Sequence, residues 1–354
     1  MAIRQPIVVL VGHIDHGKSS ILERIKGISI TKAEAGGITQ TIRSYDIPLK
    51  NVRTCCGDLL AQVGINVTIP GLLFLDSPGH AAFNNMRKRG GNLADIAILV
   101  VDVKEGMKEQ TVECIEILKQ YKTPFVIALN KIDTISGWRE EHGKALLKNI
   151  EDQPENVKKE LDQQLYTLVG KLAEHSLNAE RFDRVDDFTQ QVAIIPVSAK
   201  TNEGLPELLV TITGLAQRFL EKNLQIEVTG SGKATVLEVE EESGLGVTLD
   251  VIVYDGTLKV NDQIVIGTVN EPIVTKIRAL FEPEGKKLKS VKEVHAAAGV
   301  KVSAPNIKEV AGGVPLRVVD QGGDVEKVKE EVKKFSKERM FNQTIVLLKK
   351  LCES

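Results

Sequence analysis

Residues 7–19 read Ile-Val-Val-Leu-Val-Gly-His-Ile-Asp-His-Gly-Lys-Ser, and this stretch decides the fold of the chain. The apolar run Ile7–Val11 is followed by residues 12–19 at the spacing GxxxxGK[ST]. This motif occurs where a buried strand ends in a loop whose N–H groups surround phosphate, and where a helix begins after that loop. The stretch therefore predicts an α/β fold with a phosphate site at the carboxyl end of this strand.

The loop and the first turn of the helix supply the residues that are expected to hold a nucleotide. Lys18 is expected to reach the β- and γ-phosphate oxygens, and the Ser19 hydroxyl is expected to bind Mg²⁺. The whole predicted cradle consists of Gly12, His13, Ile14, Asp15, His16, Gly17, Lys18, Ser19 and Ser20. ATPases and kinases use the same loop, so this motif does not identify the base.

A second motif, Asn-Lys-Ile-Asp at residues 130–133, follows the apolar strand predicted at Phe125–Leu129. Ligands of open α/β sheets bind at the carboxyl ends of the strands, where these residues are expected. A carboxylate there accepts both the N1 and N2 hydrogens of guanine, and adenine offers no such pair of donors. The presence of Asp133 therefore predicts that the ligand is GTP or GDP. Asn130 is expected to bond either the base or neighbouring loops, and the Lys131 stem is expected to cover the face of the base.

A third string, Ser198-Ala199-Lys200, follows the last predicted strand of the sheet, Val192–Val197. The Ala199 N–H is expected to point to guanine O6. Each of the short strings is common in ordinary loops when it stands alone. Their order, each after a strand, favours a guanine nucleotide site.

The remaining predicted site residues lie in two loops that would face the γ-phosphate. Asp76 follows the strand Leu72–Leu75 and is expected to hold Mg²⁺ through water, while the Gly79 N–H approaches the phosphate. His80 offers an imidazole to orient the attacking water. Thr39, in a glycine-rich loop, is expected to be a second Mg²⁺ ligand and a sensor of the γ-phosphate.

The pattern of apolar residues divides the chain into two folded parts and a tail. Short β-branched runs alternate with amphipathic segments as far as Leu220, as in βαβ units with helices on both faces of a mostly parallel sheet. Residues 108–120 and 205–220 have helical spacing, and residues 140–179 suggest one or two exposed helices. We predict a P-loop domain at residues 1–225, a β-barrel domain at 226–320 and a helical segment at 321–354.

The second part shows the alternation that is typical of β-strands with one buried face. Val247, Leu249, Val251 and Val253 share a face, and Asp255-Gly256 predicts a tight hairpin after them. A small antiparallel barrel ending near Val319 would close the sheet edges. An amphipathic helix is expected after it, with Val325, Val328, Val332 and Phe335 on one face, and this helix either packs on the barrel or serves as a lever toward further domains.

Composition excludes several other classes of protein. The 46 Lys and Arg residues are balanced by 48 Asp and Glu, a net charge of -2, so a nucleic acid partner would require a local basic patch. The lysines at 286, 287, 289, 292 and 301 form one candidate, but the glutamates among them favour a solvated loop. No apolar run approaches the roughly 20 residues that span a bilayer, and the four cysteines lack metal-binding spacing. We therefore expect a cytoplasmic protein with reduced thiols and no membrane anchor.

Taken together, the strings GHIDHGKS, GGITQ, DSPGH, NKID and SAK, followed by YDGTLKVND at residues 254–262, resemble the translational GTPases. The string GGITQ is similar to the branch of initiation factors two and five B, because elongation factors usually carry an Arg before Gly-Ile-Thr. The insertion Lys50–Ile69, rich in polar turns, and the start directly in the GTPase domain are most similar to the archaeal five B factors. The resemblance covers about Ile3 to Val319.

This resemblance implies a GTP hydrolase that acts as a Mg-GTP/GDP switch on the ribosome during translation initiation. It implies that Asp15 helps to position catalytic groups or a monovalent cation, so that His80, Asp15, Lys18 and Thr39 form the catalytic set. It further implies a monomer that contacts the ribosomal RNA of both subunits. The initiator tRNA would be held by later domains of the family that lie beyond Ser354, in which case the chain is a truncated form or a short relative.

Three alternative functions are also considered for this sequence. The chain could be a ribosome-binding module that responds to GTP and hydrolyses it only incidentally. It could be an elongation-type factor that carries aminoacyl-tRNA, although GGITQ argues against this. A P-loop ATPase or kinase is disfavoured by Asn130 and Asp133.

Overall fold

The structure is a computed structural model that describes residues 2–27, 43–62, 64, 66–76, 87–88, 91–141, 143–226, 230–242, 244–284, 287–320 and 322–336. The chain divides into two compact units. One unit comprises residues 5–83 and 94–224, and we call it the α/β unit. The second comprises residues 1–4, 84–93 and 225–354, and we call it the β unit.

The α/β unit is built on a seven-stranded sheet in the order β3-β4-β2-β7-β8-β10-β9. Its strands are β2 (Ile7–Gly12), β3 (Arg43–Pro48), β4 (Gly71–Asp76), β7 (Ile96–Asp102), β8 (Phe125–Asn130), β9 (Ala179–Arg181) and β10 (Val192–Pro196). All neighbours pair in parallel except the edge strand β3, which runs antiparallel to β4. Strands β2, β4 and β7 are buried along their whole length, as expected for strands with helices on both faces.

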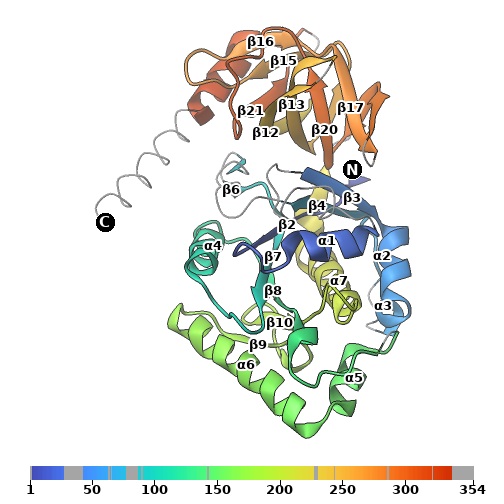
Figure 1. The fold of residues 1–354 in the computed structure, drawn as a ribbon. Helices are drawn as coiled ribbons and strands as arrows, with labels where there is room; N and C mark the ends of the chain where they lie inside the picture. Colours follow the sequence, from blue (N-terminus) through green and yellow to red (C-terminus); the bar gives the residue numbers. More distant parts are fainter. Residues whose placement is uncertain are drawn as a thin grey trace. The chain divides into compact units, whose positions relative to one another are not determined.

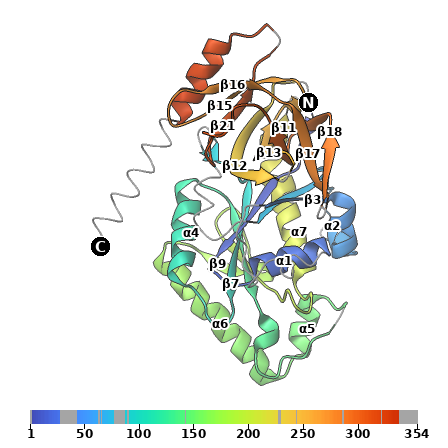
Figure 2. The same ribbon diagram turned by 45° about the horizontal axis from the view of Figure 1, so that its top comes forward.

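The helices of this unit cover both faces of the sheet (Figure 1). Helices α1 (Lys18–Lys26) and α7 (Leu205–Leu215) lie on one face, and α4 (Glu109–Gln120) and α6 (Glu155–Glu174) lie on the other, as Figure 2 also shows. This arrangement confirms the predicted fold class. It brings the carboxyl ends of β2, β4, β7, β8 and β10 to one edge, where the predicted motifs follow.

Two regions of the α/β unit differ from or refine the prediction. Residues 50–69 were expected to be rich in turns, but they contain the helices α2 (Leu49–Cys56) and α3 (Leu59–Gln62), and α2 buries Val52 and Cys56. The polar stretch 140–179 forms α5 (Leu146–Asp152) and α6, whose buried side chains recur at helical spacing. After α7 the chain continues as a π-helical turn, η5 (Ala216–Leu220), and a 3-10 turn, η6 (Glu221–Leu224).

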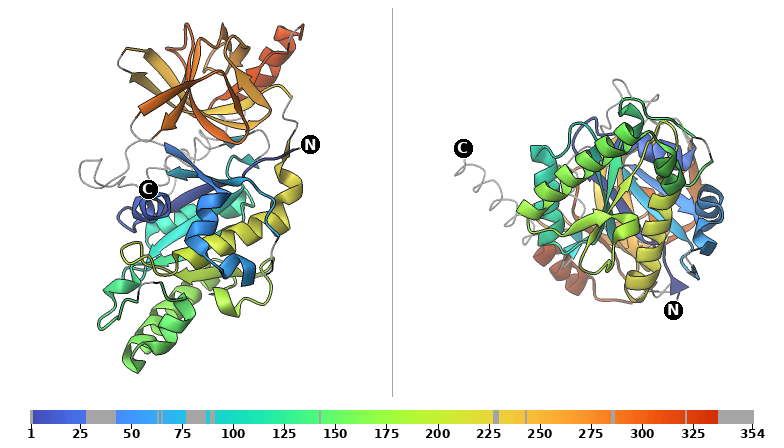
Figure 3. Two further views of the ribbon diagram at one scale, coloured as in Figure 1. Left: turned by 90° about the vertical axis from the view of Figure 1, so that its right-hand side faces the viewer. Right: turned by 90° about the horizontal axis from the view of Figure 1, so that it is seen from below.

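The β unit contains an eight-stranded antiparallel sheet in the order β16-β15-β21-β12-β13-β20-β17-β18. Its strands are β12 (Lys233–Glu242), β13 (Gly246–Asp255), β15 (Gln263–Ile266), β16 (Ile273–Lys276), β17 (Ala279–Glu284), β18 (Lys287–Val291), β20 (Ala298–Ser303) and β21 (Pro315–Val318). Short pairs add β1 (Ala2–Ile3) to β11 (Gln225–Ile226), and β5 (Arg87–Lys88) to β6 (Gly91–Asn92). The strands curve around one core, as the left view of Figure 3 shows.

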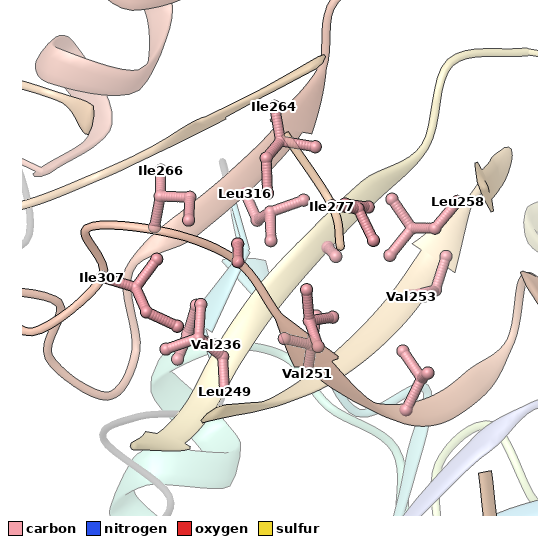
Figure 4. Packing of buried hydrophobic residues seen from close by; sticks show 14 of the residues in the cluster. Val236, Leu249, Val251, Val253, Leu258, Ile264, Ile266, Ile277, Ile307 and Leu316 are labelled. Carbon is pink, nitrogen blue, oxygen red and sulfur yellow. The ribbon is translucent and has the colours of Figure 1, made fainter. Parts of the chain in front are cut away.

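The core of the β unit is aliphatic (Figure 4). Leu249, Val251 and Val253 point into it from β13, and Val247 packs against its edge, which confirms the face predicted by alternation. Opposite them lie side chains from β15 and β21, including Ile264 and Leu316. Burial of this apolar face holds the sheet in its register.

The tight hairpin predicted at Asp255-Gly256 is wrong. Gly256 has a positive φ of 66°, so the chain does turn, but β14 (Thr257–Lys259) pairs with β19 (Glu293–His295) instead of β13. A Cβ on Gly256 would lie 2.5 Å from the carbonyl oxygens of Gly230 and Ser231. The glycine is therefore required because another segment of main chain passes close to it.

Within the helical segment predicted at residues 321–354, residues 325–336 form a helix that packs on the β unit (Figure 2), and residues 337–354 lie outside the described residues. Val332 is buried against Val265 and Val319, and Val325 and Val328 pack beside it. Of the two roles left open by the sequence, the structure therefore shows packing on the barrel. Among the described residues, none of the helices combines the length and the apolar character needed to cross a bilayer.

Candidate nucleotide-binding site

The loop between β2 and α1 has the backbone geometry that its glycines predict. Gly12 has a φ of 139°, and a Cβ there would lie 2.3 Å from the Val100 carbonyl oxygen. Gly17 has a φ of 96°, and a Cβ there would lie 2.3 Å from Asn130 Nδ2. Asp15 also lies in the left-handed region, with a φ of 63°. Glycine at both ends lets the loop pass close to Val100 of β7 and Asn130 of β8 before the helix begins at Lys18.

Lys18 is buried inside this curve, with 8% of its surface exposed. Its ammonium donates to the carbonyl oxygens of Gly12 at 3.1 Å and His13 at 2.7 Å. Burial lowers the pKa of Lys18, an effect that the charge of Asp76 partly opposes. A buried cation held by main-chain carbonyls at a helix N-terminus is suited to bind an anion.

Ser19 and Asp76 meet at the metal end of the site. The Ser19 hydroxyl donates to Asp76 Oδ2 at 2.9 Å, and Asp76 is fully buried. A hydroxyl and a carboxylate are hard oxygen donors that suit Mg²⁺, which commonly takes its other ligands from phosphate and water. In the described part of the chain no cluster of three or more His, Cys, Asp or Glu could hold a metal alone. Thr39, Gly79 and His80 lie outside the described residues.

At the base end, Asn130 joins two loops. Its Nδ2 donates to the His16 carbonyl at 2.8 Å, and its Oδ1 accepts the Ala199 N–H at 3.2 Å. Of the two roles left open for Asn130, the structure shows the bonds to neighbouring loops. The Ala199 N–H that was predicted to face guanine O6 is bonded to this amide, so the two acceptors would have to share or exchange it.

Asp133 is oriented by the serine of the third motif. The buried Ser198 hydroxyl donates to Asp133 Oδ1 at 2.6 Å, and Lys200 Nζ lies 3.8 Å from Oδ2. Asp133 stands in the 3-10 turn η3 (Ile132–Thr134), which begins after Lys131 in the left-handed region with a φ of 66°. The turn presents the carboxylate beside the Ser198–Lys200 loop.

An open cleft of about 890 Å³ lies at the carboxyl edge of the sheet, and Lys18, Ser19 and Asp76 are not part of its lining. Seven predicted residues border it: Gly17, Ser20, Asn130, Lys131, Asp133, Ala199 and Lys200. Four others, Glu23, Arg24, Gly27 and Thr134, complete its lining. The volume falls within the range of pockets that hold small molecules and cofactors.

The side chain of His16 does not face the cleft, although residue 16 was predicted to help hold the nucleotide. The ring is fully buried, with Nδ1 3.3 Å from both the Val100 carbonyl oxygen and the Asp102 nitrogen, and burial lowers its pKa. It packs edge to face on His13, at 5.1 Å between ring centres. The His16 ring thus packs between the loop and β7, and the main chain of His16 contacts a residue of the cleft through its carbonyl bond to Asn130.

Two contacts at the site were not predicted. Arg24 on α1 donates from Nε to the Ala199 carbonyl at 3.1 Å and from Nη2 to the Lys200 carbonyl, which ties the phosphate helix to the base loop. Asp102, at the end of β7, accepts from Lys131 Nζ at 2.8 Å. Burial by itself would raise the pKa of Asp102, but the bond from Lys131 and two main-chain N–H groups outweigh it and lower the pKa. The position of Asp102 at the carboxyl end of a buried strand was a signal that could have found it.

Comparisons with known proteins agree with this geometry. Residues 4–218 match the family model described as the Elongation factor Tu GTP binding domain. The chain is 52% identical over 345 residues to a probable translation initiation factor IF-2 of Methanopyrus kandleri, which covers 95% of this chain and 58% of that protein. It is 48% identical over 340 residues to the protein of the same name from Archaeoglobus fulgidus, covering 94% and 57%.

A solved structure is also similar. The crystal structure of GDP-bound aIF5B from Aeropyrum pernix matches with a TM-score of 0.86 and 43% identity, over 93% of this chain and 56% of that one. The chain thus spans a little over half the length of these relatives. By this family match and these similarities, the chain belongs to the translational GTPases that carry the Elongation factor Tu GTP binding domain, in the branch of the archaeal IF-2 and aIF5B proteins.

Proposed function

We propose that this chain binds GTP and GDP with Mg²⁺ in the cleft of the α/β unit and hydrolyses GTP as a switch in translation initiation. The observation that supports the proposal most strongly is that the Asn130 side chain connects the phosphate loop to the base loop. Asn130 Nδ2 bonds the phosphate loop at His16, and Asn130 Oδ1 bonds the base loop at Ala199. A ligand with both a polyphosphate and a guanine base fits this pair of loops.

The chemistry follows from the residues at each end. Lys18 would neutralise charge on the β- and γ-phosphates, and Ser19, Asp76 and Thr39 would hold Mg²⁺. When bound, the metal would offset the negative charge that develops on the transferred phosphoryl group. His80 would orient the attacking water, with the Gly79 N–H on the γ-phosphate. Asp15 would steady the phosphate region or a monovalent cation beside it.

The relatives support the place of this switch in the cell. Two of them are named probable translation initiation factor IF-2, and the similar solved structure is described as GDP-bound aIF5B. We therefore propose that the ribosome is the partner, that it stimulates hydrolysis, and that the protein works in the cytoplasm as a monomer. Joining of the ribosomal subunits and placement of the initiator tRNA would be tasks of the full-length family.

The test is turnover of GTP and ATP measured with and without each ribosomal subunit. We expect slow hydrolysis of GTP alone, stimulation by ribosomes, and no comparable turnover of ATP. His80→Ala should lower the stimulated rate by about 10²- to 10⁴-fold with GTP binding nearly unchanged, as for loss of a water-orienting group. Ribosome binding with negligible hydrolysis in the parent chain would favour a GTP-responsive binding module instead.

A further inference from the structure

A buried carboxylate stands behind the base loop, outside the cleft. Glu203 is 5% exposed and does not line the nucleotide cleft. It borders a separate cleft of about 410 Å³, which the neighbouring residues Thr201, Asn202 and Gly204 also line. A buried carboxylate is costly unless several donors satisfy it, so its surroundings indicate its role.

Four donors from two segments converge on this carboxylate. Oε2 accepts from the indole Nε1 of Trp138 at 3.2 Å and from the Thr201 hydroxyl. Oε1 accepts from the Glu141 N–H at 3.3 Å and from Asn149 Nδ2. Three of these donors belong to residues 138–149, which lie before and within α5. Glu203 therefore fastens the loop after β10 to a distant part of the chain.

The loop needs such an anchor because its backbone is tightly bent. Asn202 and Gly204 both have a φ of 73°, in the left-handed region. A Cβ on Gly204 would lie 2.0 Å from the Pro196 carbonyl oxygen. Glu203 stands between these two residues, so its carboxylate bonds hold the point at which the loop reverses.

The main chain carries this constraint to the guanine-binding groups. The Glu203 carbonyl accepts the Ser198 N–H at 2.9 Å, and the Ser198 hydroxyl donates to Asp133 Oδ1 at 2.6 Å. The same hydroxyl accepts the Thr201 N–H at 3.2 Å. Movement of Glu203 would therefore displace the serine that orients Asp133 and the Ala199 N–H beside it.

We propose that Glu203 is a positioning residue for guanine recognition, which holds the loop 198–204 so that Asp133 and the Ala199 N–H can both meet the base. This proposal rests on the proposed binding of guanine nucleotides. It assigns to Trp138, Glu141 and Asn149, which lie outside the nucleotide cleft and donate to Glu203, a share in base selectivity.

The test compares GDP with inosine diphosphate, which lacks the 2-amino group that Asp133 is expected to bond. Titration calorimetry gives both dissociation constants for the parent chain, Glu203→Gln and Glu207→Gln. Glu207 is the matched control, because it is a buried glutamate of α7, 8% exposed, that accepts from the Leu146 N–H at 2.7 Å and does not line the nucleotide cleft. We expect Glu203→Gln to reduce the preference for GDP over inosine diphosphate by about tenfold, the effect of one misaligned hydrogen bond, and Glu207→Gln to leave it unchanged.

Each outcome decides the proposal. A merely structural role would weaken both nucleotides equally, so an unchanged preference in folded Glu203→Gln overturns it. If that variant does not fold, as judged by loss of its cooperative thermal unfolding transition, then Thr201→Val carries the test and should reduce the preference by roughly threefold. Failure of the parent chain to bind GDP overturns the proposed function itself, which distinguishes the two failures.

Discussion

Two buried lysines, one in each unit, have opposite surroundings. Lys18 in the α/β unit is 8% exposed and donates to two main-chain carbonyls. Lys301 on β20 of the β unit is 7% exposed, and its Nζ lies 2.8 Å from Glu240 Oε2 and 3.1 Å from Asp250 Oδ2. Glu242 lies farther away, at 3.9 Å.

The pKa shifts of the two lysines follow from these partners. Burial lowers the pKa of Lys18. Burial would also lower that of Lys301, but the hydrogen bonds and charges of Glu240 and Asp250 outweigh it and raise the pKa. A buried lysine held by neutral carbonyls keeps a positive charge that a bound anion can balance, whereas one surrounded by carboxylates is already neutralised. Lys301 is therefore neither part of a solvated loop, as its sequence neighbours had suggested, nor a free cation for RNA phosphates.

Replacing each lysine by methionine should affect nucleotide binding very differently in the two units. Lys18→Met should weaken GDP binding by about 3 to 5 kcal/mol, roughly 10²- to 10⁴-fold, because it removes the buried partner of the phosphates. Lys301→Met should leave GDP affinity within about twofold, since it lies in the other unit and is already paired. Calorimetric titration of both variants measures the two effects, and equal losses would show that neither lysine is specific to the site.

At the base end of the same site, Asp133 should contribute selectivity for guanine in addition to charge. Asp133→Asn replaces one acceptor by a donor, so GTP affinity should fall by about 2 to 4 kcal/mol, while xanthosine triphosphate should gain because xanthine presents a carbonyl there. Competition against a fluorescent guanine nucleotide measures both changes. Unchanged GTP affinity would remove Asp133 from the site.

Lys301 is expected to matter for the stability of the β unit, although not for nucleotide affinity. Lys301→Met leaves Asp250 and Glu240 without their buried cation, so the β unit should lose about 1 to 3 kcal/mol, toward the low end for buried pairs because both carboxylates are partly exposed. Hydrogen exchange read separately over the strands β12, β13 and β20 measures this loss. Protection that stays at the parent level would show that the cluster is only loosely formed.

The smallest expected effect is a difference in how the two units respond to pH. Burial raises the pKa of Asp250 to about 6, above its unfolded value, so its contribution to stability is largest at low pH and is lost as the pH rises through about 6. Burial lowers the pKa of His16 below its unfolded value, so its contribution is present above about pH 6.5 and is lost as the pH falls.

From pH 7 to 5, protection against hydrogen exchange should therefore increase in the strands β12, β13 and β20 around Asp250 and decrease in β7 and the first loop around His16. Asp250→Asn should flatten the response of the β unit and leave that of the α/β unit unchanged. Parallel responses in the two units would contradict the assignment of the shifts to these two residues.

Much of the site could be predicted because its motifs follow buried strands. The apolar run before Asn130 predicted that Asp133 lies at the sheet edge. The glycine spacing of the first loop predicted that Lys18 lies inside the curve of that loop. These features are local in sequence, so a short window contains the physical reason for each. The packing face of the C-terminal helix was predictable for the same reason, although the surface it covers was not.

The parts that sequence could not supply depend on contacts between distant segments. Glu203 acquires its role only when Trp138 and Asn149 approach it in space. Lys301 stands in a lysine-rich stretch, but two neighbouring strands surround it with carboxylates. The hairpin error has the same origin, because the turn at Gly256 serves the close passage of residues 230–231 instead of a hairpin.

In the proposed function, Lys18 and Asp133 belong to one guanine nucleotide site. Calorimetric titration of the unmodified chain with GDP, ADP and guanosine, each in the presence of Mg²⁺, tests whether they do. We predict that GDP binds at least about 100-fold more tightly than either of the other two, because ADP cannot satisfy Asp133 and guanosine leaves Lys18 without a phosphate. Equal affinity for GDP and ADP, or for GDP and guanosine, would contradict the account.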